Sequence, residues 1–118
     1  MKKENELSKR LLMFSVAVIK FTRLLPKESE FNIIKYQLVK SATSVGANYE
    51  EAQSASSRSD FKNKVNISLK EIAESKYWLK IISEIYEKCY YQTNLTILIQ
   101  EAKELDKILG SIVKNTKS

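Results

Sequence analysis

The chain has 118 residues, the length of one domain, and 20 Lys and Arg against 14 Asp and Glu leave a net charge of +6. It contains no histidine and one cysteine, Cys89, so zinc and triad chemistry lack their commonest member and an internal disulfide is excluded. Two glycines and one proline are too few for the turns of a sheet protein. We therefore expect an all-α domain over residues 1–118 that is not an enzyme and holds no metal or cofactor. Because the chain has one cysteine and no apolar run long enough to span a bilayer, we expect it in the cytoplasm.

The first helix is predicted over residues 5–25, ahead of Pro26. Its core-facing residues are spaced by three and four: Leu7, Leu11, Phe14, Val18, Phe21 and Leu25. A second apolar stripe, Leu12, Val16 and Ile19, lies roughly 120 to 180° away around the same helix. One bundle cannot bury both stripes, which predicts an interface between copies in a homo-oligomer. The alternative is that the second stripe consists of isolated exposed apolar residues.

The same helix carries most of the excess positive charge. Residues 1–24 hold six Lys or Arg against two Glu, and Lys9, Lys20 and Arg23 fall in one narrow sector, with Arg10 beside them. Such a patch, multiplied in an oligomer, would attract the phosphates of RNA or DNA. The alternative is a solvated helix face with no ligand.

The second helix is predicted over residues 30–56, with Ser29 as its N-cap. Its apolar stripe consists of Phe31, Ile34, Leu38, Val45, Tyr49 and Ala52, with Ser41 or Ala42 between them. The stretch SATSVGANYEEAQ, residues 41–53, is rich in small side chains, and Gly46 costs about 1 kcal/mol of helix propensity. We expect this stretch to let the third helix approach closely; the alternative is that its hydroxyls simply face solvent.

The third helix is predicted over residues 58–89, capped by Ser57 with Asp60 three residues later. Its apolar face contains Phe61, Val65, Ile72, Leu79, Ile82 and Tyr86. Small residues at Ser68, Ala73 and Ser75 are expected to meet those of the second helix. The paired carboxylates are interpreted as ion-pairing groups rather than metal ligands, because di-metal bundle sites use Glu-x-x-His pairs: Glu50 with Glu51, and Glu71 with Glu74.

The fourth helix is predicted over residues 94–115, capped by Thr93 or Asn94. Its stripe consists of Leu95, Leu98, Ala102, Leu105, Leu109 and Ile112. Short connections make each helix the antiparallel neighbour of the next, which predicts an elongated up-down-up-down bundle roughly 40 Å long. An aromatic cluster is expected to close one end of it: Trp78, Tyr86, Tyr90 and Tyr91. The alternative is that these rings stack on the bases of a nucleic acid.

Residues 41–82, SATSVGANYEEAQSASSRSDFKNKVNISLKEIAESKYWLKII, resemble the central signature of the four-helix-bundle family encoded in intervening sequences of bacterial 23S ribosomal RNA genes. Its positions fall on Ser44, Gly46, Asn48, Glu50, Glu51, Ala52, Arg58, Asp60, Phe61, Lys70, Glu71, Glu74, Tyr77, Trp78 and Leu79. Two positions depart from the family pattern: Ser75 stands where threonine is expected, and Ser68 where alanine is commoner.

This resemblance implies a homopentamer shaped like a barrel with a central channel, and most members have no established activity. A related branch, the accessory variability determinant of diversity-generating retroelements, is a basic pentamer that binds a reverse transcriptase and nucleic acid. Two functions follow as hypotheses. The chain is either a pentameric adaptor that holds nucleic acid through the basic residues of its first helix, or a structural or protein-partner module that binds no nucleic acid.

Overall fold

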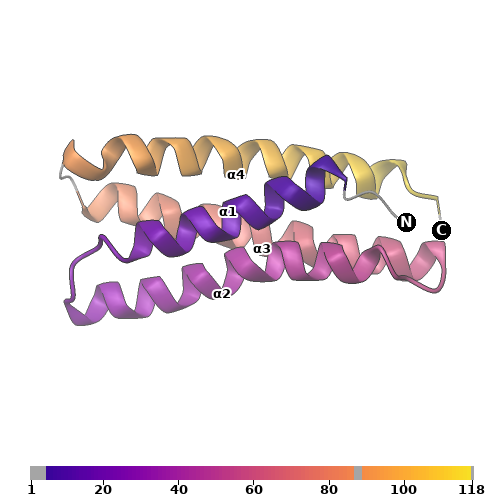
Figure 1. The fold of residues 1–118 in the computed structure, drawn as a ribbon, viewed down its shortest axis with the longest axis horizontal. Helices are drawn as coiled ribbons and strands as arrows, with labels where there is room; N and C mark the ends of the chain where they lie inside the picture. Colours follow the sequence, from indigo (N-terminus) through magenta and orange to yellow (C-terminus); the bar gives the residue numbers. More distant parts are fainter. Residues whose placement is uncertain (1–4, 87–88, 118) are drawn as a thin grey trace.

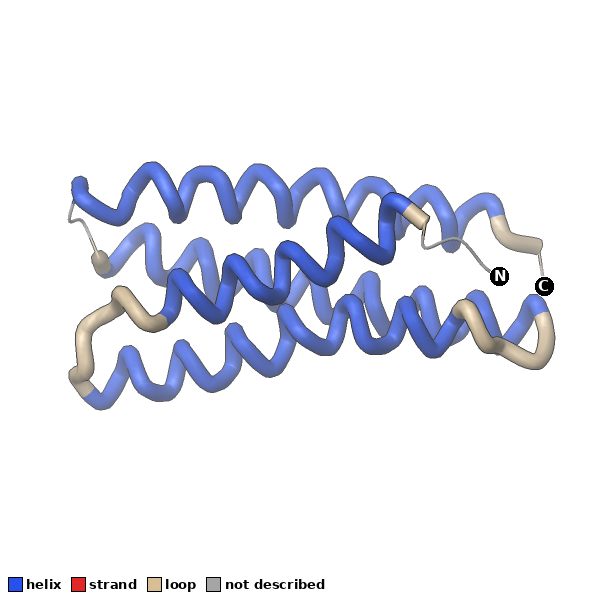
Figure 2. The backbone as a smooth tube through the Cα atoms, in the orientation of Figure 1, coloured by secondary structure: helices blue, strands red, loops and turns tan. Residues whose placement is uncertain are grey.

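The computed structural model describes residues 5–86 and 89–117, leaving aside the side chains of residues 89–91. These residues form four α-helices: α1 (Glu6–Thr22), α2 (Ser29–Ala52), α3 (Arg58–Ile85) and α4 (Cys89–Asn115). Successive helices run in opposite directions, with α1 in front of α3 and between α2 and α4 (Figure 1). The bundle measures 45 × 25 × 20 Å, and its helices are joined by short loops (Figure 2). The predicted all-α, elongated four-helix architecture is confirmed.

The core consists of the predicted apolar stripes. Every predicted core position on α2 is buried, and α1, α3 and α4 each contribute a buried row that continues the same spacing. Only the ends of the stripes are half-buried: Leu7, Phe61, Tyr86 and Ile112. In the part of the chain that is described, no helix is long and apolar enough to cross a membrane.

Side-chain caps explain the starts of α1 and α3. The Asn5 side chain accepts a hydrogen bond from the Ser8 amide at 2.7 Å and starts α1. The predicted Ser57 cap of α3 is confirmed, because its hydroxyl accepts from the Asp60 amide at 3.0 Å. The predicted Ser29 cap is wrong by one residue: Glu28 has extended backbone, no side-chain cap bond forms, and Ser29 is already helical. α1 ends at Thr22 rather than at residue 25, because Pro26 disfavours helical backbone just before it.

The turn between α3 and α4 lies earlier than predicted. α3 ends at Ile85, and Tyr86 has extended backbone with its ring edge-on to Phe31 at 5.5 Å. Thr93 and Asn94, predicted as caps, are exposed residues inside α4. The aromatic contact with the start of α2 fixes where the chain turns, and this tertiary preference outweighs the local capping signal. Of the predicted aromatic cluster, the side chains of Tyr90 and Tyr91 lie outside the described residues, as does that of Cys89.

Candidate functional site

The seam between α2 and α3 is closed by serine hydroxyls. Ser41 Oγ lies 2.8 Å from Ser75 Oγ, and Ser68 Oγ donates to the carbonyl oxygen of Val45 at 2.8 Å; all three serines are fully buried. Hydroxyls that bond across the seam or to a backbone carbonyl need no water, so the two helices can approach closely. The expected tight contact between small residues is therefore present. Ala73, expected in it, is exposed instead.

Gly46 serves a different contact from the one predicted. A Cβ atom placed on Gly46 would lie 3.5 Å from the Cβ of Leu11 and 3.7 Å from its carbonyl oxygen, so this residue faces α1 rather than α3. Ser15 joins the same two helices by donating to the Ala42 carbonyl oxygen at 3.2 Å. The small residues of α2 thus accommodate two neighbours, α3 on one side and α1 on another. The helical spacing of the small residues was the available signal for this second contact.

Several signature residues form a polar cluster at the edge of this seam. Asn48 Nδ2 donates to Ser44 Oγ at 3.0 Å, and Trp78 Nε1 donates to Glu74 Oε2 at 3.0 Å. Burial raises the pKa of the Glu71 carboxyl, and the neighbouring Glu74 raises it further, against a hydrogen bond from Ser44 and the charge of Lys40. The predicted ion-pairing role of Glu71 and Glu74 is wrong, since neither forms a salt bridge in the described structure.

The remaining signature residues lie apart from this cluster. Glu51 pairs with Lys64 at 3.1 Å, and Asp60 accepts from the Ser56 amide at 3.2 Å within the turn between α2 and α3. Arg58 and Lys70 are exposed, as is Glu50, which lies beside α1. Together, the signature residues mainly fix helix ends and helix packing. Among the described residues, no three Cys, Asp or Glu side chains come together to hold a metal ion.

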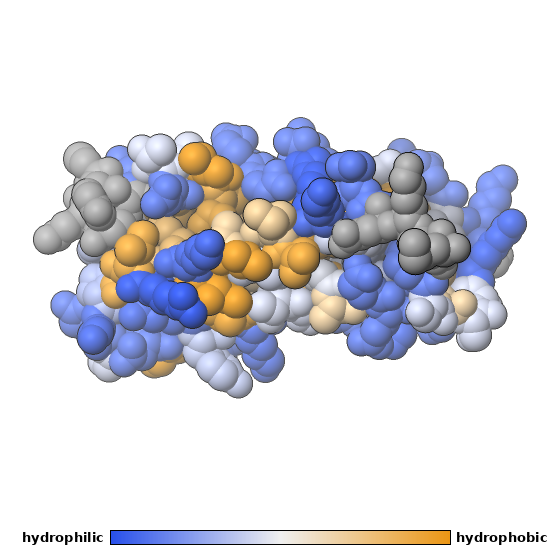
Figure 3. Space-filling view, viewed as in Figure 1, coloured by the Kyte–Doolittle hydropathy of each residue, from blue (hydrophilic) through white to orange (hydrophobic). Residues whose placement is uncertain are grey.

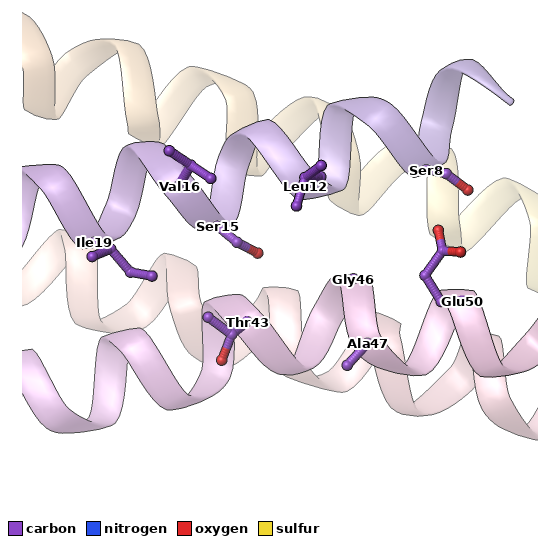
Figure 4. A pocket seen from close by; sticks show the side chains of 9 residues that line it. All are labelled: Ser8, Leu12, Ser15, Val16, Ile19, Thr43, Gly46, Ala47 and Glu50. Carbon is purple, nitrogen blue, oxygen red and sulfur yellow. The ribbon is translucent and has the colours of Figure 1, made fainter. Parts of the chain in front are cut away.

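The second apolar stripe of α1 forms one wall of a groove. Leu12 is 56% exposed and Val16 and Ile19 are half-buried, while Thr43, Gly46 and Ala47 of α2 line the opposite wall (Figure 4). The groove has a volume of about 450 Å³ and is open to solvent. On the other side of α1, a second apolar groove runs between Met13 and Ala17 and the α4 residue Ile97. Figure 3 shows apolar side chains spread over α1 and the adjoining part of α2.

The four basic residues predicted as a site do not behave alike. Arg10 binds Glu101 of α4 through two hydrogen bonds, Nη2 to Oε1 at 2.6 Å and Nε to Oε2 at 3.1 Å, and also lies 3.3 Å from Glu104. The hydrogen bond to Glu101 raises the pKa of Arg10, against the opposing effect of burial. Arg10 therefore joins α1 to α4 and is not available as a free cation.

Lys9, Lys20 and Arg23 are exposed and form no salt bridge within the described structure. At 100° per residue they occupy the same sector of α1 as Val16, which lies between them. The outer face of α1 is therefore one surface on which apolar and cationic side chains alternate, and not two separate patches.

Comparisons with known proteins agree with this architecture. The chain is similar to a crystal structure of a protein with unknown function from the S23 ribosomal protein family of Bacteroides thetaiotaomicron VPI-5482, at 34% identity and a TM-score of 0.81, covering 92% of this chain and 99% of that chain. No curated protein matches the present chain. The model of the 23S rRNA-intervening sequence protein family matches residues 3–111. The chain therefore belongs to the 23S rRNA-intervening sequence protein family.

Proposed function

We propose that this protein is a non-enzymatic helical bundle that assembles with further copies of itself through the outer face of α1. The observation that carries the proposal is the exposure of Leu12, at 56%, beside Val16 and Ile19 on a helix whose opposite face is already buried in the core. Exposed apolar residues that line a groove are typical of protein interfaces. Most soluble oligomers are built from copies of one chain, so a second copy is the partner that we assign to this face.

The geometry around α1 supports a packing of helix against groove. α1 stands between two apolar grooves, one shared with α2 and one with α4, so it presents a ridge flanked by hollows. A ridge on one copy can enter a hollow on the next, and repeating such a head-to-tail contact generates a ring when the rotation between copies closes. Five copies are the number that the family resemblance implies.

Val16→Glu tests the assembly. A carboxylate at this position would lose its hydration on assembly, and an exposed ion pair with Lys20, one turn away, offsets little of that cost, so we expect light scattering to show an oligomer for the wild type and a folded monomer for the variant. Thr93→Glu, which adds the same charge at an exposed position on α4, is the matched control and should leave the oligomer intact. A wild-type protein that is monomeric at high concentration contradicts the proposal.

A second candidate function is an adaptor that holds nucleic acid through the phosphate groups. The specific observation in its favour is that Lys9, Lys20 and Arg23 are exposed and form no ion pair with any described residue, on a chain of net charge +6. Binding of this kind does not read bases and weakens steeply as salt rises. Because these cations alternate with the apolar stripe, a copy packed on α1 would cover part of them.

Charge reversal of Lys9, Lys20 and Arg23 tests this second function. We expect weaker binding of an RNA fragment and a shallower dependence of log affinity on log salt. Unchanged salt dependence would exclude these residues as the site. If the wild type binds neither RNA nor DNA at physiological salt, the alternative of a structural or protein-partner module is favoured.

A further inference from the structure

A basic groove runs between α3 and α4, on the edge of the bundle opposite the groove between α1 and α2. Both α1 and α3 contact α2 and α4, so the four helices are arranged in a cycle. In this cycle the edge between α3 and α4 lies opposite the edge between α1 and α2. The basic groove comprises two adjoining hollows of about 530 and 480 Å³, which share Lys76 and Lys103. Lys107 lines the first hollow and Lys80 the second.

The acidic residues in this groove are already engaged. Asp106 binds Lys76 at 2.7 Å, and Glu104 lies 3.3 Å from Arg10 of α1. Lys80, Lys103 and Lys107 are exposed and form no salt bridge within the described structure. Glu84, one turn beyond Lys80, is the acidic side chain at the end of α3. The groove itself therefore keeps a net positive charge that comes from both of its walls.

An exposed aromatic ring lies among these lysines. Tyr77 is 61% exposed and lines the same hollow as Lys80 and Lys103. Its ring is braced by an edge-on contact with Trp78, at 5.6 Å between centroids and 69° between planes. Trp78 is in turn held by its hydrogen bond to Glu74. Tyr77 is therefore a supported aromatic ring with cations on either side of it.

We propose that the groove between α3 and α4 binds single-stranded nucleic acid, with Lys80, Lys103 and Lys107 on the phosphates and one base stacked on Tyr77. A positively charged groove with an exposed aromatic side chain is the arrangement by which proteins hold unpaired strands. A duplex keeps its bases stacked on one another and so cannot use Tyr77. Lysines act as point charges suited to phosphate, whereas planar carboxylates of an acidic peptide are better matched by arginine forks. This site requires neither self-association nor the cations of α1.

The test measures fluorescence anisotropy of a fluorescein-labelled oligouridine about 15 nucleotides long, a length within the site sizes of single-strand binders. The groove variant combines three substitutions: Lys80→Glu, Lys103→Glu and Lys107→Glu. It should bind at least about tenfold more weakly, and its log affinity should fall less steeply with log salt, with a slope smaller in magnitude by about 2. The variant Lys27→Glu, Arg58→Glu and Lys117→Glu carries the same change in charge at exposed positions outside this groove and outside α1, and is the matched control. It should retain the larger part of the affinity.

Tyr77→Ala should weaken binding by about fivefold or more, and Tyr77→Phe should restore it, because stacking needs the ring and not the hydroxyl. Tyr36→Ala is the control for loss of an exposed tyrosine, since Tyr36 is 64% exposed on α2. It should bind as the wild type does. Circular dichroism establishes that each variant is folded.

Three outcomes overturn the proposal. The first is equal loss in the groove variant and in its charge-matched control, which reflects net charge alone; the second is unchanged binding in Tyr77→Ala, which removes the stacked base. The third is loss in the charge-reversed variant of Lys9, Lys20 and Arg23 with no loss in the groove variant, which overturns this site while supporting the second candidate function. Because self-association is measured separately by light scattering, its failure does not affect this result.

Discussion

The seam between α2 and α3 buries polar side chains, whereas the outer face of α1 exposes apolar ones. In the seam, Ser41, Ser68 and Ser75 are polar residues in a fully buried place, and each hydroxyl has a partner. On the outer face of α1, Leu12 is an apolar residue in solvent, next to cations without ion pairs. The polar groups of the seam thus find their hydrogen-bond partners within one chain, whereas the outer face of α1 leaves an apolar side chain exposed to solvent. This difference indicates that interactions with other molecules are to be sought on the outside of the bundle.

The same contrast separates the residues that identify the family, which pack the helices, from the surfaces that we propose bind other molecules. The signature residues concentrate on α2 and α3, where their visible roles are a cross-helix hydrogen bond, a cap or a close contact. Ser44, Asn48 and Glu71 lie in one polar cluster, and among the described residues no three Cys, Asp or Glu side chains come together there. A diagnostic sequence pattern can therefore report how the bundle is packed and leave its ligands undetermined.

The largest expected effect is in the seam. Ser68→Leu replaces a hydroxyl by a bulkier isopropyl group at a fully buried position and removes the hydrogen bond to Val45, so it should lower the free energy of unfolding by about 3 kcal/mol. Ala47→Leu adds comparable bulk in the open groove beside α1 and should change the free energy of unfolding by less than about 0.5 kcal/mol. Urea unfolding measures both. Equal costs would break the comparison between a closed seam and an open face.

A smaller effect of opposite sign is expected at Gly46. The 3.5 Å contact that a Cβ would make with Leu11 is an ordinary van der Waals distance, so Gly46→Ala gains helix propensity without a clash. We expect a stabilisation of up to about 1 kcal/mol, and Gly110→Ala, whose Cβ would be 3.9 Å from Leu69, should gain at least as much. Destabilisation by Gly46→Ala alone would mean that α1 and α2 need a closer contact than the distances indicate.

The apolar periodicity was sufficient to predict the fold, because every helix buries one stripe and that stripe is visible in the spacing. The Ser57 cap was predictable for the same kind of reason, since the signal and its partner lie three residues apart. The turn at Tyr86 was not predictable from nearby residues, because the Tyr86 ring contacts Phe31 of α2, which is distant in sequence. Local signals near Thr93 and Asn94 pointed to a cap, and a tertiary contact outweighed them.

The candidate sites were predictable only in part. The exposed stripe followed from helical angles alone, because Leu12 and Val16 cannot face the same core as Leu11 and Val18. The role of Arg10 did not, since its partner Glu101 comes from a helix that only folding brings near. The basic groove was missed for the same reason. Lys80 and Lys103 belong to different helices, and their signal appears once α3 and α4 are known to be neighbours.

The smallest expected effect concerns Glu71, a partly buried carboxyl at the edge of the seam. Its pKa is raised in the folded protein, first by burial and then by Glu74, so the folded state disfavours the carboxylate relative to the unfolded chain. The stability that Glu71 contributes is fully present below its unfolded pKa and is lost as the pH rises through its folded pKa. Glu71→Gln keeps an acceptor for Ser44 without the charge, so it should become more stable than the wild type as pH rises.

The difference between Glu71→Gln and wild type should therefore be near zero at about pH 4 and reach its maximum by about pH 7, within about 0.5 kcal/mol. Unfolding midpoints at a series of pH values measure it. Glu51→Gln, at an exposed pair with Lys64, should show no such gain on raising the pH. Glu74→Gln offers a sharper test, because removing that neighbour should bring the pKa of Glu71 down in an NMR titration. A Glu71 pKa unaffected by Glu74→Gln would leave burial as its sole cause.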